Sequence, residues 1–345
     1  MKKLILTSLV ISLFACSSDE ENTQSLETFT VSNLAGSTIG DVDGTGDNAK
    51  FSFPRGLTID NAGNLYLADY NNHKIKKITP QGVVTTLAGS TRGDADGTGT
   101  SAKFDYPNGI TIDASGNLYV TSHYSHKIKK VTPTGIVTTI AGSILGDLNG
   151  TGAAARFNFP SGITIDASGN LYVCDQNNHK IKKITPAGVV TTIAGSTEGF
   201  QDGNGSNARF STPIGIAIDG NGNLFVCDNA NEKIRKITPQ GDVSTFVGST
   251  QGDLNGTGTG AKLDAPRKIL IDASGNLYIT EDGNHKVKKI TPQAVVTTIA
   301  GSTEGDLNGN ALEAKFDGPD SVVIDANGNF FVSDTYNHKI KKIAR

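Results

Sequence analysis

The sequence is built on an eight-residue segment that returns every 53 residues. Its second copy is Ile112-Asp113-Ala114-Ser115-Gly116-Asn117-Leu118-Tyr119. The aspartates that mark the six copies are Asp60, Asp113, Asp166, Asp219, Asp272 and Asp325. A fixed period of this length is typical of repeat arrays and propellers. Six copies of one unit therefore predict a single body with a shared core, although 345 residues would otherwise suggest two or three domains.

Each repeat is predicted to contain four short strands, which we call a to d. In the second copy they cover 109–112, 118–121, 127–131 and 136–141. The segments between them carry glycine, which permits positive φ, and proline, which presets φ at the start of a turn. Strands of this length joined by short hairpins form a meander, so we predict an all-β, six-bladed propeller of four-stranded antiparallel blades. The repeats lie near 56–88, 109–141, 162–194, 215–247, 268–300 and 321–343.

The two ends of the repeat region complement each other. The sixth unit stops after its strand c, Lys339 to Ile343, and has no strand d. Val31 to Ser37 copies the strand d segment Val84 to Ser90, but no strands a to c precede it. We therefore predict a propeller over 28–345 in which the N-terminal strand, within 28–35, completes the last blade and removes its free edge.

The motif Pro107-x-Gly-Ile-Thr-Ile-Asp, followed by Gly-Asn-Leu-Tyr-Val and by His126-Lys127-Ile128, resembles the NHL repeat. The resemblance covers essentially Thr28 to Arg345, with Glu232 in place of the histidine in the fourth copy and Lys268 in place of glycine in the fifth. It implies a six-bladed propeller. NHL proteins bind proteins, RNA or small molecules, and some are enzymes, so the resemblance leaves the function open.

The first 16 residues indicate export. Lys2 and Lys3 precede an apolar run, Leu4 to Phe14, which is too short to span a bilayer and is typical of a signal-peptide core. The ending Leu13-Phe14-Ala15-Cys16 resembles the lipobox of bacterial lipoproteins, which implies a diacylated Cys16 at the mature N-terminus. We predict a signal peptide over 1–15 and a lipid anchor on Cys16. The alternative is an ordinary secretory signal with a chance cysteine.

Residues 16–27 predict a disordered tether, because they are polar and acidic and lack apolar periodicity. Their serine-and-acid run resembles the surface-export signal of Bacteroidota lipoproteins. The resemblance implies a lipid-anchored protein of the outer membrane that faces the cell exterior. A plain solvated linker, with the propeller in the periplasm, is the alternative.

The charge pattern does not predict a nucleic-acid partner. The chain has 31 basic and 34 acidic residues, a formal charge of −3. Each strand c carries a basic run, as in Lys74-Ile75-Lys76-Lys77, and the six runs together contain 18 of the basic residues without interleaved aromatic residues. We interpret these runs as a solvated outer flank whose lysines discourage pairing between strand edges.

Three recurring features could carry chemistry. Histidines precede strand c in five copies, and we expect them to brace the turn between strands b and c, because equivalent atoms in different blades are too far apart to share a metal. The connections into each blade contain Asp-x-Asp/Asn-Gly, as at Asp94 to Gly97, which resembles the start of a calcium loop but lacks its closing glutamate. Calcium is the one cofactor that the sequence suggests. Cys174 and Cys227 share one repeat position, and we expect both to be buried free thiols.

The repeats differ from one another mainly at one end of the blades. In a meander, the a–b and c–d turns lie on one face, here called the regular face, and the b–c turns and the connections between blades lie on the other, the variable face. The fold places the same structural constraints on equivalent positions of all blades. Residues that differ between blades on the variable face are therefore not required by the fold and could bind a ligand. The candidate site residues are Arg55, Tyr70, Asn108, His123, Tyr124, Arg267, Lys268, Asp282, Asp320 and Tyr336.

Tyrosine and arginine are frequent anchors of binding sites, and a ring gathers distant residues into one funnel. We therefore predict a binding module for an extracellular or periplasmic protein or glycan. A calcium-dependent propeller enzyme of the lactonase or streptogramin-type lyase class is one alternative. Strand a, however, offers only apolar and small side chains such as Ile110-Thr111-Ile112 in place of acids, bases or nucleophiles. A purely structural envelope protein is the other alternative.

Overall fold

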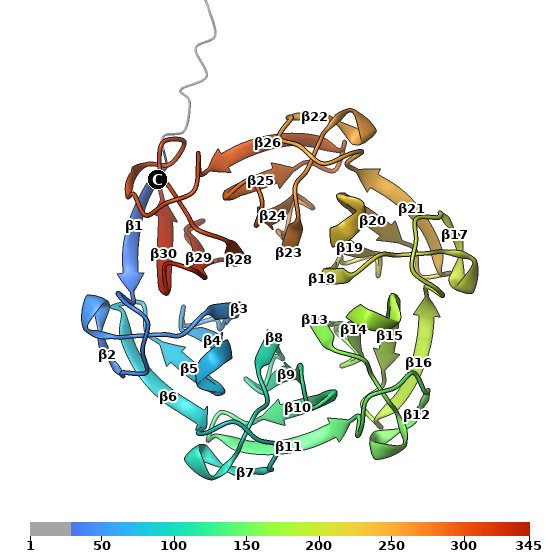
Figure 1. The fold of residues 1–345 in the computed structure, drawn as a ribbon, viewed down its shortest axis with the longest axis horizontal. Coiled ribbons are helices and arrows are strands. Elements are labelled where there is room, and N and C mark those ends of the chain that lie inside the picture. The colour runs from blue at the N-terminus through green and yellow to red at the C-terminus, as the bar shows by residue number, and fades with distance from the viewer. Residues whose placement is uncertain (1–28) are drawn as a thin grey trace, which may run out of the picture.

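The computed structural model describes residues 29–345, which form six β-sheets arranged as blades around a central channel (Figure 1). The predicted signal peptide over 1–15, the lipidated Cys16 and the tether over 16–27 lie outside the described residues. None of the helices within 29–345 has the length and apolar character needed to cross a membrane.

The innermost strand of every blade begins at a proline, because a strand edge can tolerate a residue without an N–H donor. These strands a are β3 (Pro54–Ile59), β8 (Pro107–Ile112), β13 (Pro160–Ile165), β18 (Pro213–Ile218), β23 (Pro266–Ile271) and β28 (Pro319–Ile324). The next strands outward, strands b, are β4 (Leu65–Asp69), β9 (Leu118–Ser122), β14 (Leu171–Asp175), β19 (Leu224–Asp228), β24 (Leu277–Glu281) and β29 (Phe330–Asp334).

Strands c carry the basic runs. They are β5 (Lys74–Ile78), β10 (Lys127–Val131), β15 (Lys180–Ile184), β20 (Lys233–Ile237), β25 (Lys286–Ile290) and β30 (Lys339–Ala344). Strands d of the first five blades are β6 (Val83–Gly89), β11 (Ile136–Ala141), β16 (Val189–Ala194), β21 (Asp242–Val247) and β26 (Val295–Ala300). The four strands expected in each repeat are therefore confirmed.

Each blade also contains a fifth strand that the sequence pattern did not predict. The connection into the blade lays two residues antiparallel to strand d, and this short edge strand is β2 (Gly44–Thr45), β7 (Gly97–Thr98), β12 (Gly150–Thr151), β17 (Gly203–Asn204), β22 (Gly256–Thr257) or β27 (Gly309–Asn310). A two-residue strand shows no alternation of polar and apolar residues, so periodicity could not reveal it. Its effect is to cover the outer edge of strand d.

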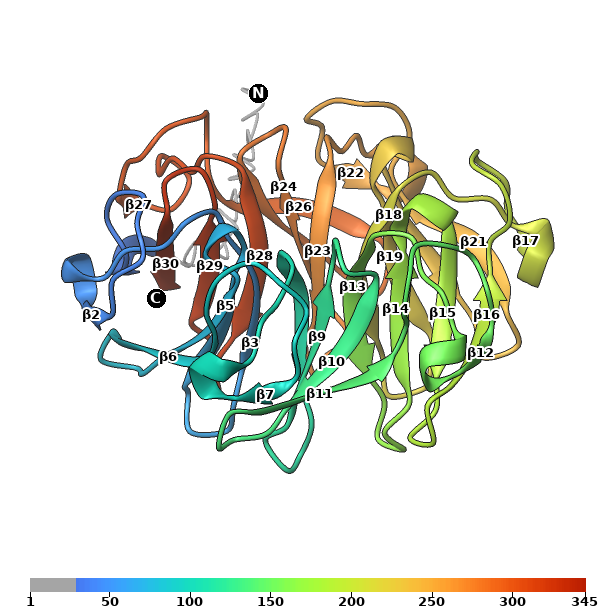
Figure 2. The same ribbon diagram turned by 60° about the horizontal axis from the view of Figure 1, so that its bottom comes forward.

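Short 3-10 helices follow most of these edge strands and three of the b strands. The first group is η1 (Gly46–Asn48), η3 (Gly99–Ser101), η4 (Gly152–Ala154), η6 (Gly205–Asn207) and η8 (Gly258–Gly260). The second group is η2 (Tyr70–Asn72), η5 (Gln176–Asn178) and η7 (Asn229–Asn231). Figure 2 shows the strands running between the two faces, with the connecting loops at both ends.

The N-terminal strand closes the ring as predicted. β1 (Thr30–Ala35) pairs antiparallel with β30, with Val31 opposite Ile343 and Ser32 opposite Lys342. Figure 1 shows this junction, where the blue first strand lies beside the red last one. Because β27 then pairs with β1, the sixth sheet has the same five-stranded order as the other five.

The hydrophobic core lies between adjacent blades. The cluster around Phe104, for example, joins Tyr66, Ala68 and Ile75 of blade one to Leu118 and Val120 of blade two. Phe104 and its counterparts in the other connections are fully buried and hold the connecting loops against the body. Each blade therefore needs its neighbours to bury its faces, as expected for a closed repeat protein.

The middle cation of each basic run is buried, so our interpretation of a solvated flank is wrong for this position. The six side chains are at most 1% exposed and are Lys76, Lys129, Lys182, Arg235, Lys288 and Lys341. The connecting loop covers this residue on the face opposite the preceding apolar residue, and a buried cation must be paired. Lys182, for example, contacts the buried carboxylate of Asp175 at 2.8 Å and Asp147 of the loop at 3.0 Å.

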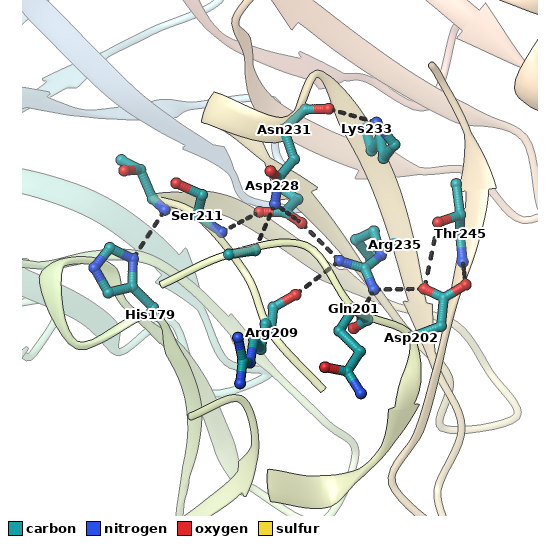
Figure 3. Close-up of polar contacts among 12 residues, drawn as sticks. His179, Gln201, Asp202, Arg209, Ser211, Asp228, Asn231, Lys233, Arg235 and Thr245 are labelled. Atoms are coloured by element: carbon teal, nitrogen blue, oxygen red, sulfur yellow. Dashed lines mark hydrogen bonds and ion pairs between the residues drawn. The ribbon is translucent and has the colours of Figure 1, made fainter. Parts of the chain in front are cut away.

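Blade four shows the complete arrangement (Figure 3). Arg235 Nη1 donates to Asp228 at 2.7 Å and to the Arg209 carbonyl at 3.0 Å, while Nη2 donates to the Gln201 carbonyl at 3.0 Å and to Asp202 at 2.5 Å. The strand b carboxylate, the strand c cation and the connecting loop thus form one network. Strand b carries this carboxylate in every blade except the second, where Ser122 replaces it.

The recurring histidines link neighbouring blades. His73 Nδ1 accepts a hydrogen bond of 3.2 Å from the backbone N–H of Tyr106 in the next blade, and His126 accepts one of 3.2 Å from Phe159. His73 itself has φ 57°, so it also forms the left-handed end of its turn. The bracing role that we predicted is correct, but it extends across the blade boundary.

Candidate functional site

The regular face is uniform because one aspartate organises each a–b turn. Asp113 Oδ1 accepts from the backbone N–H groups of Ser115 at 2.9 Å and Asn117 at 2.8 Å, and equivalent bonds recur in the other blades. Grooves between neighbouring blades hollow this face, and the one between blades three and four has a volume of about 610 Å³. These grooves are larger than the cavity of the central channel, which has a volume of about 170 Å³, but their linings repeat the same turn residues. They are therefore a consequence of the fold.

The variable face carries an aromatic cluster over the first three blades, formed by Tyr70, Tyr106, His123, Tyr124 and Phe159. Ring centroids are 4.8 Å apart for Tyr70 and Tyr106, and 4.7 Å for Tyr106 and Tyr124. Tyr124 and Phe159 meet edge to face at 5.0 Å. Contacts of this kind stabilise a cluster beyond simple burial.

Two arginines lie against this cluster. The Arg55 guanidinium stacks on the Tyr70 ring at 3.6 Å from its centroid. Arg92, on the connecting loop, lies 5.2 Å from the Tyr106 centroid and pairs with Asp105 at 2.8 Å. Burial raises the pKa of Tyr70 to about 12, although the nearby Arg55 acts in the opposite direction. Tyr70 therefore stays a neutral phenol.

Tyr106 and Phe159 are functional candidates that the sequence reasoning missed. They precede the proline of strand a and adopt positive φ, 55° for Tyr106 and 54° for Phe159, which is a strained conformation for an aromatic residue. Phe53 occupies the same position in blade one and contacts Tyr336 at 5.8 Å between centroids. This position changes to Thr212, Ala265 and Gly318 in the other blades, and that variation was the available signal.

His123 is buried and neutral. Its Nδ1 lies 3.0 Å from the Pro160 carbonyl, and because a carbonyl can only accept, Nδ1 carries the hydrogen. Burial lowers the pKa of His123 to about 4. Asn229 and Thr335 donate to the corresponding proline carbonyls of their neighbouring blades, so His123 Nδ1 serves a structural contact and only Nε2 is left for other chemistry.

A second group of candidates, here called the ionic cluster, lies over blades five and six and comprises Arg267, Asp282 and Asp320. Arg267 Nη2 contacts Asp282 Oδ2 at 2.8 Å, and its Nη1 is 3.9 Å from Asp320 Oδ2. Burial opposes the charge of Arg267, but the two carboxylates outweigh it and raise the pKa of the guanidinium. Tyr336 lies beside this cluster and is 47% exposed.

Eight of the ten predicted residues thus fall into two groups, and Asn108 and Lys268 belong to neither. The ten residues also differ in accessibility. Tyr124 is 43% exposed, while Arg55, Arg267 and Asp282 are half-buried. Five of the other candidates are buried. They are Tyr70, Asn108, His123, Lys268 and Asp320.

The loop carboxylates considered for calcium instead contact lysine. In blade two, Asp94 and Asp96 lie 3.0 and 2.8 Å from Lys129 Nζ. Within 29–345, no group of three or more His, Cys, Asp or Glu side chains is placed to hold a metal ion. These loops as they stand therefore do not fit a calcium site.

Cys174 and Cys227 are free and fully buried, as predicted. Burial raises the pKa of both thiols. A buried thiol with a raised pKa is a poor nucleophile, so both cysteines serve packing between blades.

The profile of the Virginiamycin B lyase family matches residues 31–341, nearly the whole described propeller. The chain belongs to the Virginiamycin B lyase family. Its NHL-type repeats also match NHL repeat-containing protein 2 from Gallus gallus, which is 28% identical over 334 residues covering 84% of this chain and 46% of the relative. The chain thus spans about half the length of that relative.

Solved structures show how widely this fold of the Virginiamycin B lyase family is shared. An auxiliary nutrient binding protein from Bacteroides ovatus ATCC 8483 superposes with a TM-score of 0.71 at 17% identity, over 92% of this chain and 76% of that chain. Virginiamycin B lyase from Staphylococcus aureus superposes with a TM-score of 0.57 at 17% identity, over 92% of this chain and 99% of that chain. Likeness at these identities establishes the fold, and function must be argued from the site.

Proposed function

We propose that the propeller is a carbohydrate-binding module and that its variable face is the binding surface. The observation that carries this proposal is the exposed ring of Tyr124, which is held in place by Tyr106 and Phe159 and is accompanied by the exposed Tyr336. A rigid aromatic ring with water on one side presents a flat apolar face and a polar edge, as a sugar ring does. Half-buried Arg55, which stacks on Tyr70 of this cluster, and half-buried Arg267 and Asp282, which lie near Tyr336, would supply hydrogen bonds to hydroxyl groups.

The fold comparisons support a binding role. The propeller of the auxiliary nutrient binding protein from Bacteroides ovatus is similar in fold, and a nutrient-binding role suits a protein on the cell envelope. We further propose that the mature protein is lipid-anchored at Cys16 in the outer membrane and faces the cell exterior, where glycans are met. Ala15-Cys16 and the acidic run after it motivate this location.

A glycan array probed with the chain from residue 28 onward tests the binding role. The variant with Tyr124→Ala and Tyr336→Ala removes two exposed rings, together with the edge contacts that they make with Phe159 and Phe53. It should weaken binding to any glycan that the array identifies by tenfold or more, and a thermal melt checks that it is folded. The matched control replaces Asn61, Ser115 and Ser168, which are exposed on the regular face, with alanine. Equal losses in the two folded variants would show that the variable face is not the binding surface.

Cell fractionation tests the anchor. Cys16→Ala removes the only thiol that lipid could modify in the N-terminal segment, so the protein should move from the membrane fraction to the soluble fraction. Continued membrane association of this variant would refute the lipid anchor. Protease digestion of intact cells distinguishes an exterior propeller from a periplasmic one.

Lyase activity is the second candidate, and the family match over 31–341 favours it. A structure of virginiamycin B lyase from Staphylococcus aureus contains quinupristin, so that compound is the direct test substrate. Incubation of the wild-type chain with quinupristin, followed by chromatography, would support a lyase if the compound were consumed and if His123→Ala stopped its consumption. An unchanged substrate peak would leave the binding role as the better account.

A further inference from the structure

Lys268 occupies a position at which most blades require glycine. The third residue of strand a is Gly56, Gly109, Gly162, Gly215, Lys268 and Ser321 in blades one to six. A Cβ on Gly56, Gly109 or Gly162 would lie 2.2 Å from a backbone carbonyl oxygen of the next blade, and one on Gly215 would lie 2.4 Å from the Arg267 carbonyl. The close approach of the next blade therefore leaves no room for a side chain at this position in four of the six blades, whereas blade five has a lysine there.

The Lys268 ammonium has no partner within the described residues. The side chain lines the central channel, a cavity of about 170 Å³, together with Leu57, Ile110 and Ile163. Lys268 is 8% exposed, yet its Nζ makes no hydrogen bond and no ion pair. Burial of an unpaired cation costs free energy unless a partner of opposite charge or a hydrogen-bond acceptor contacts it. Burial accordingly lowers the pKa of Lys268, against the opposing effect of Asp320.

Two buried acceptors near the channel mouth are also unpartnered. Asn108 Oδ1 and Asp320 Oδ1 make no hydrogen bond, and both residues hold the second position of their strand a, one place before the position that Lys268 occupies in blade five. Asn108 Nδ2 donates to Ser161 Oγ at 3.4 Å, so the free oxygen is the acceptor that remains. One hydrogen-bond donor and two acceptors without partners therefore lie near the variable-face end of the strands that line the channel.

The charges at this mouth do not cancel. Arg55 stacks on Tyr70 and pairs with no carboxylate among residues 29–345, while Arg267 is held by Asp282 and Asp320. His123 faces the same group and is neutral, because burial lowers its pKa to about 4. The three cations Arg55, Arg267 and Lys268 therefore face two carboxylates, which leaves one uncompensated positive charge. A monoanion would balance it.

We propose that the channel mouth binds a carboxylate between Lys268 and Arg55, and that the saccharides recognised by the variable face are acidic ones carrying a uronic acid. The choice of a saccharide rests on the proposed function. A uronate combines one negative charge for Lys268 and Arg55 with hydroxyl donors for Asn108 and Asp320. Sulfate supplies the charge but has no hydroxyl hydrogen to donate at neutral pH.

Isothermal titration of the full chain with sodium D-glucuronate, D-glucose and sodium sulfate tests this assignment. Wild type should bind glucuronate at least tenfold more tightly than glucose or sulfate. Lys268→Gly copies the residue of four other blades and should reduce glucuronate affinity tenfold or more, whereas Lys268→Arg should retain it within a few fold. Thermal melts check that each variant is folded. Arg55→Met, which keeps an apolar contact with Tyr70, gives a second route to the same loss if Lys268→Gly does not fold.

Several outcomes would overturn the proposal. Equal binding of glucuronate to wild type and to folded Lys268→Gly would show that the lysine meets no carboxylate. Sulfate binding as tight as glucuronate binding would make the mouth a general anion site and would exclude recognition of a uronate. Binding of neutral glycans to the variable face, with no preference for glucuronate, would refute this inference while the proposed carbohydrate-binding role stands.

Discussion

Glu232 accepts a hydrogen bond of 2.6 Å from the backbone N–H of Ala265. In the other blade junctions a histidine Nδ1 accepts the corresponding bond, as His179 does from Thr212 at 3.2 Å. Both residues adopt the left-handed conformation, with φ 58° at Glu232 and 55° at His179. A carboxylate and a neutral imidazole are both acceptors, so the fourth junction keeps the link with a different chemical group.

Glu232→His should therefore fold, and its stability relative to wild type should depend on pH. Burial raises the pKa of Glu232, so the contribution of the glutamate is fully present below its unfolded pKa and declines as pH rises through its folded pKa. Burial lowers the pKa of the equivalent His73, so a histidine contributes above its unfolded pKa and loses this contribution as pH falls. We expect the free energies of unfolding of Glu232→His and wild type to agree within about 1 kcal/mol at pH 8. At pH 5.5 we expect the variant to be clearly less stable than wild type.

Urea unfolding of the two proteins at both pH values measures this effect. Glu232→Ala is the control, because it leaves the Ala265 N–H without an acceptor and should cost about 1–3 kcal/mol at either pH. A Glu232→His variant that is more stable at pH 5.5 than at pH 8, relative to wild type, would contradict the shared role of the two residues.

The repeat predicted the fold well because the same short-range signals occur six times. The 53-residue period, the turn chemistry around Asp113 and the orphan strand near Val31 each pointed to one closed ring, and the pairing of β1 with β30 confirms the closure. The edge strand at Gly97–Thr98 escaped prediction, because two residues are too few to show a period.

The buried cations were misread for a different reason. The run Lys180-Ile181-Lys182-Lys183 is strongly basic, yet the connecting loop covers Lys182, whose Nζ contacts Asp175 and Asp147. Lys182 lies opposite Val173, and it reaches Asp175 diagonally only once the strands are paired and the loop aspartate has folded over them. Charge composition alone cannot distinguish a solvated lysine from a paired buried one.

The sequence indicated which face of the propeller carries the candidate residues, but it did not indicate how deeply each of them is buried. Variation between copies correctly selected residues that share the variable face, including Arg55 and Tyr124. It did not reveal that Tyr70 lies beneath Arg55, or that Tyr106 completes the aromatic cluster. Packing between blades decides these depths, and that packing depends on contacts between residues far apart in the sequence.

The buried pair Asp228 and Arg235 should be strongly coupled. Both side chains are fully buried, and Arg235→Met would leave the Asp228 carboxylate without its cation, which should cost about 3–5 kcal/mol. Asp228→Ser copies blade two, where Ser122 occupies this position. The double variant should cost clearly less than the sum of the two single changes, as a double-mutant cycle of urea unfolding would show. Simple additivity would mean that the pair contributes no mutual stabilisation.

Asp69 should reduce the stability of the propeller as pH rises from 4 to 7. Burial raises its pKa from an ordinary 3.8 to about 7, although Asn72, the Ser52 N–H and Lys76 act in the opposite direction. The folded state therefore binds a proton that the unfolded state has released, and the contribution of the protonated carboxyl is lost as pH rises through 7.

Asp69→Ser tests this effect with a natural match, because Ser122 accepts the equivalent backbone hydrogen bond from Asp105 at 3.0 Å. Lys76 retains Asp41 and Asp43, as Lys129 retains Asp94 and Asp96. As pH rises from 5 to 7, the free energy of unfolding of the variant should increase by about 2 kcal/mol relative to that of wild type. A stability difference that is constant over this range in urea unfolding would show that Asp69 is ionised throughout.

Removal of β1 should open the ring. A chain that begins at residue 28 keeps every pairing of β1 with β30, whereas a chain that begins at residue 38 loses them all together with the buried side chains of Val31 and Ala35. We expect the longer chain to melt like the full protein and the shorter one to melt on the order of 10 °C lower, because the loss of a strand removes several kcal/mol.

Because the shorter chain exposes the edge of β30, we also expect it to self-associate and to regain stability when a replacement strand is added. An unpaired strand edge accepts another strand, so the shorter chain should self-associate in analytical ultracentrifugation. A synthetic peptide covering residues 28–38 should bind this edge by strand addition and restore the melting temperature, while a peptide of the same composition in scrambled order should not. The restoring effect should depend on Val31, which is 1% exposed in the intact ring, and a Val31→Asp peptide should fail. Identical melting of the two chains would show that the last blade is stable without its N-terminal strand.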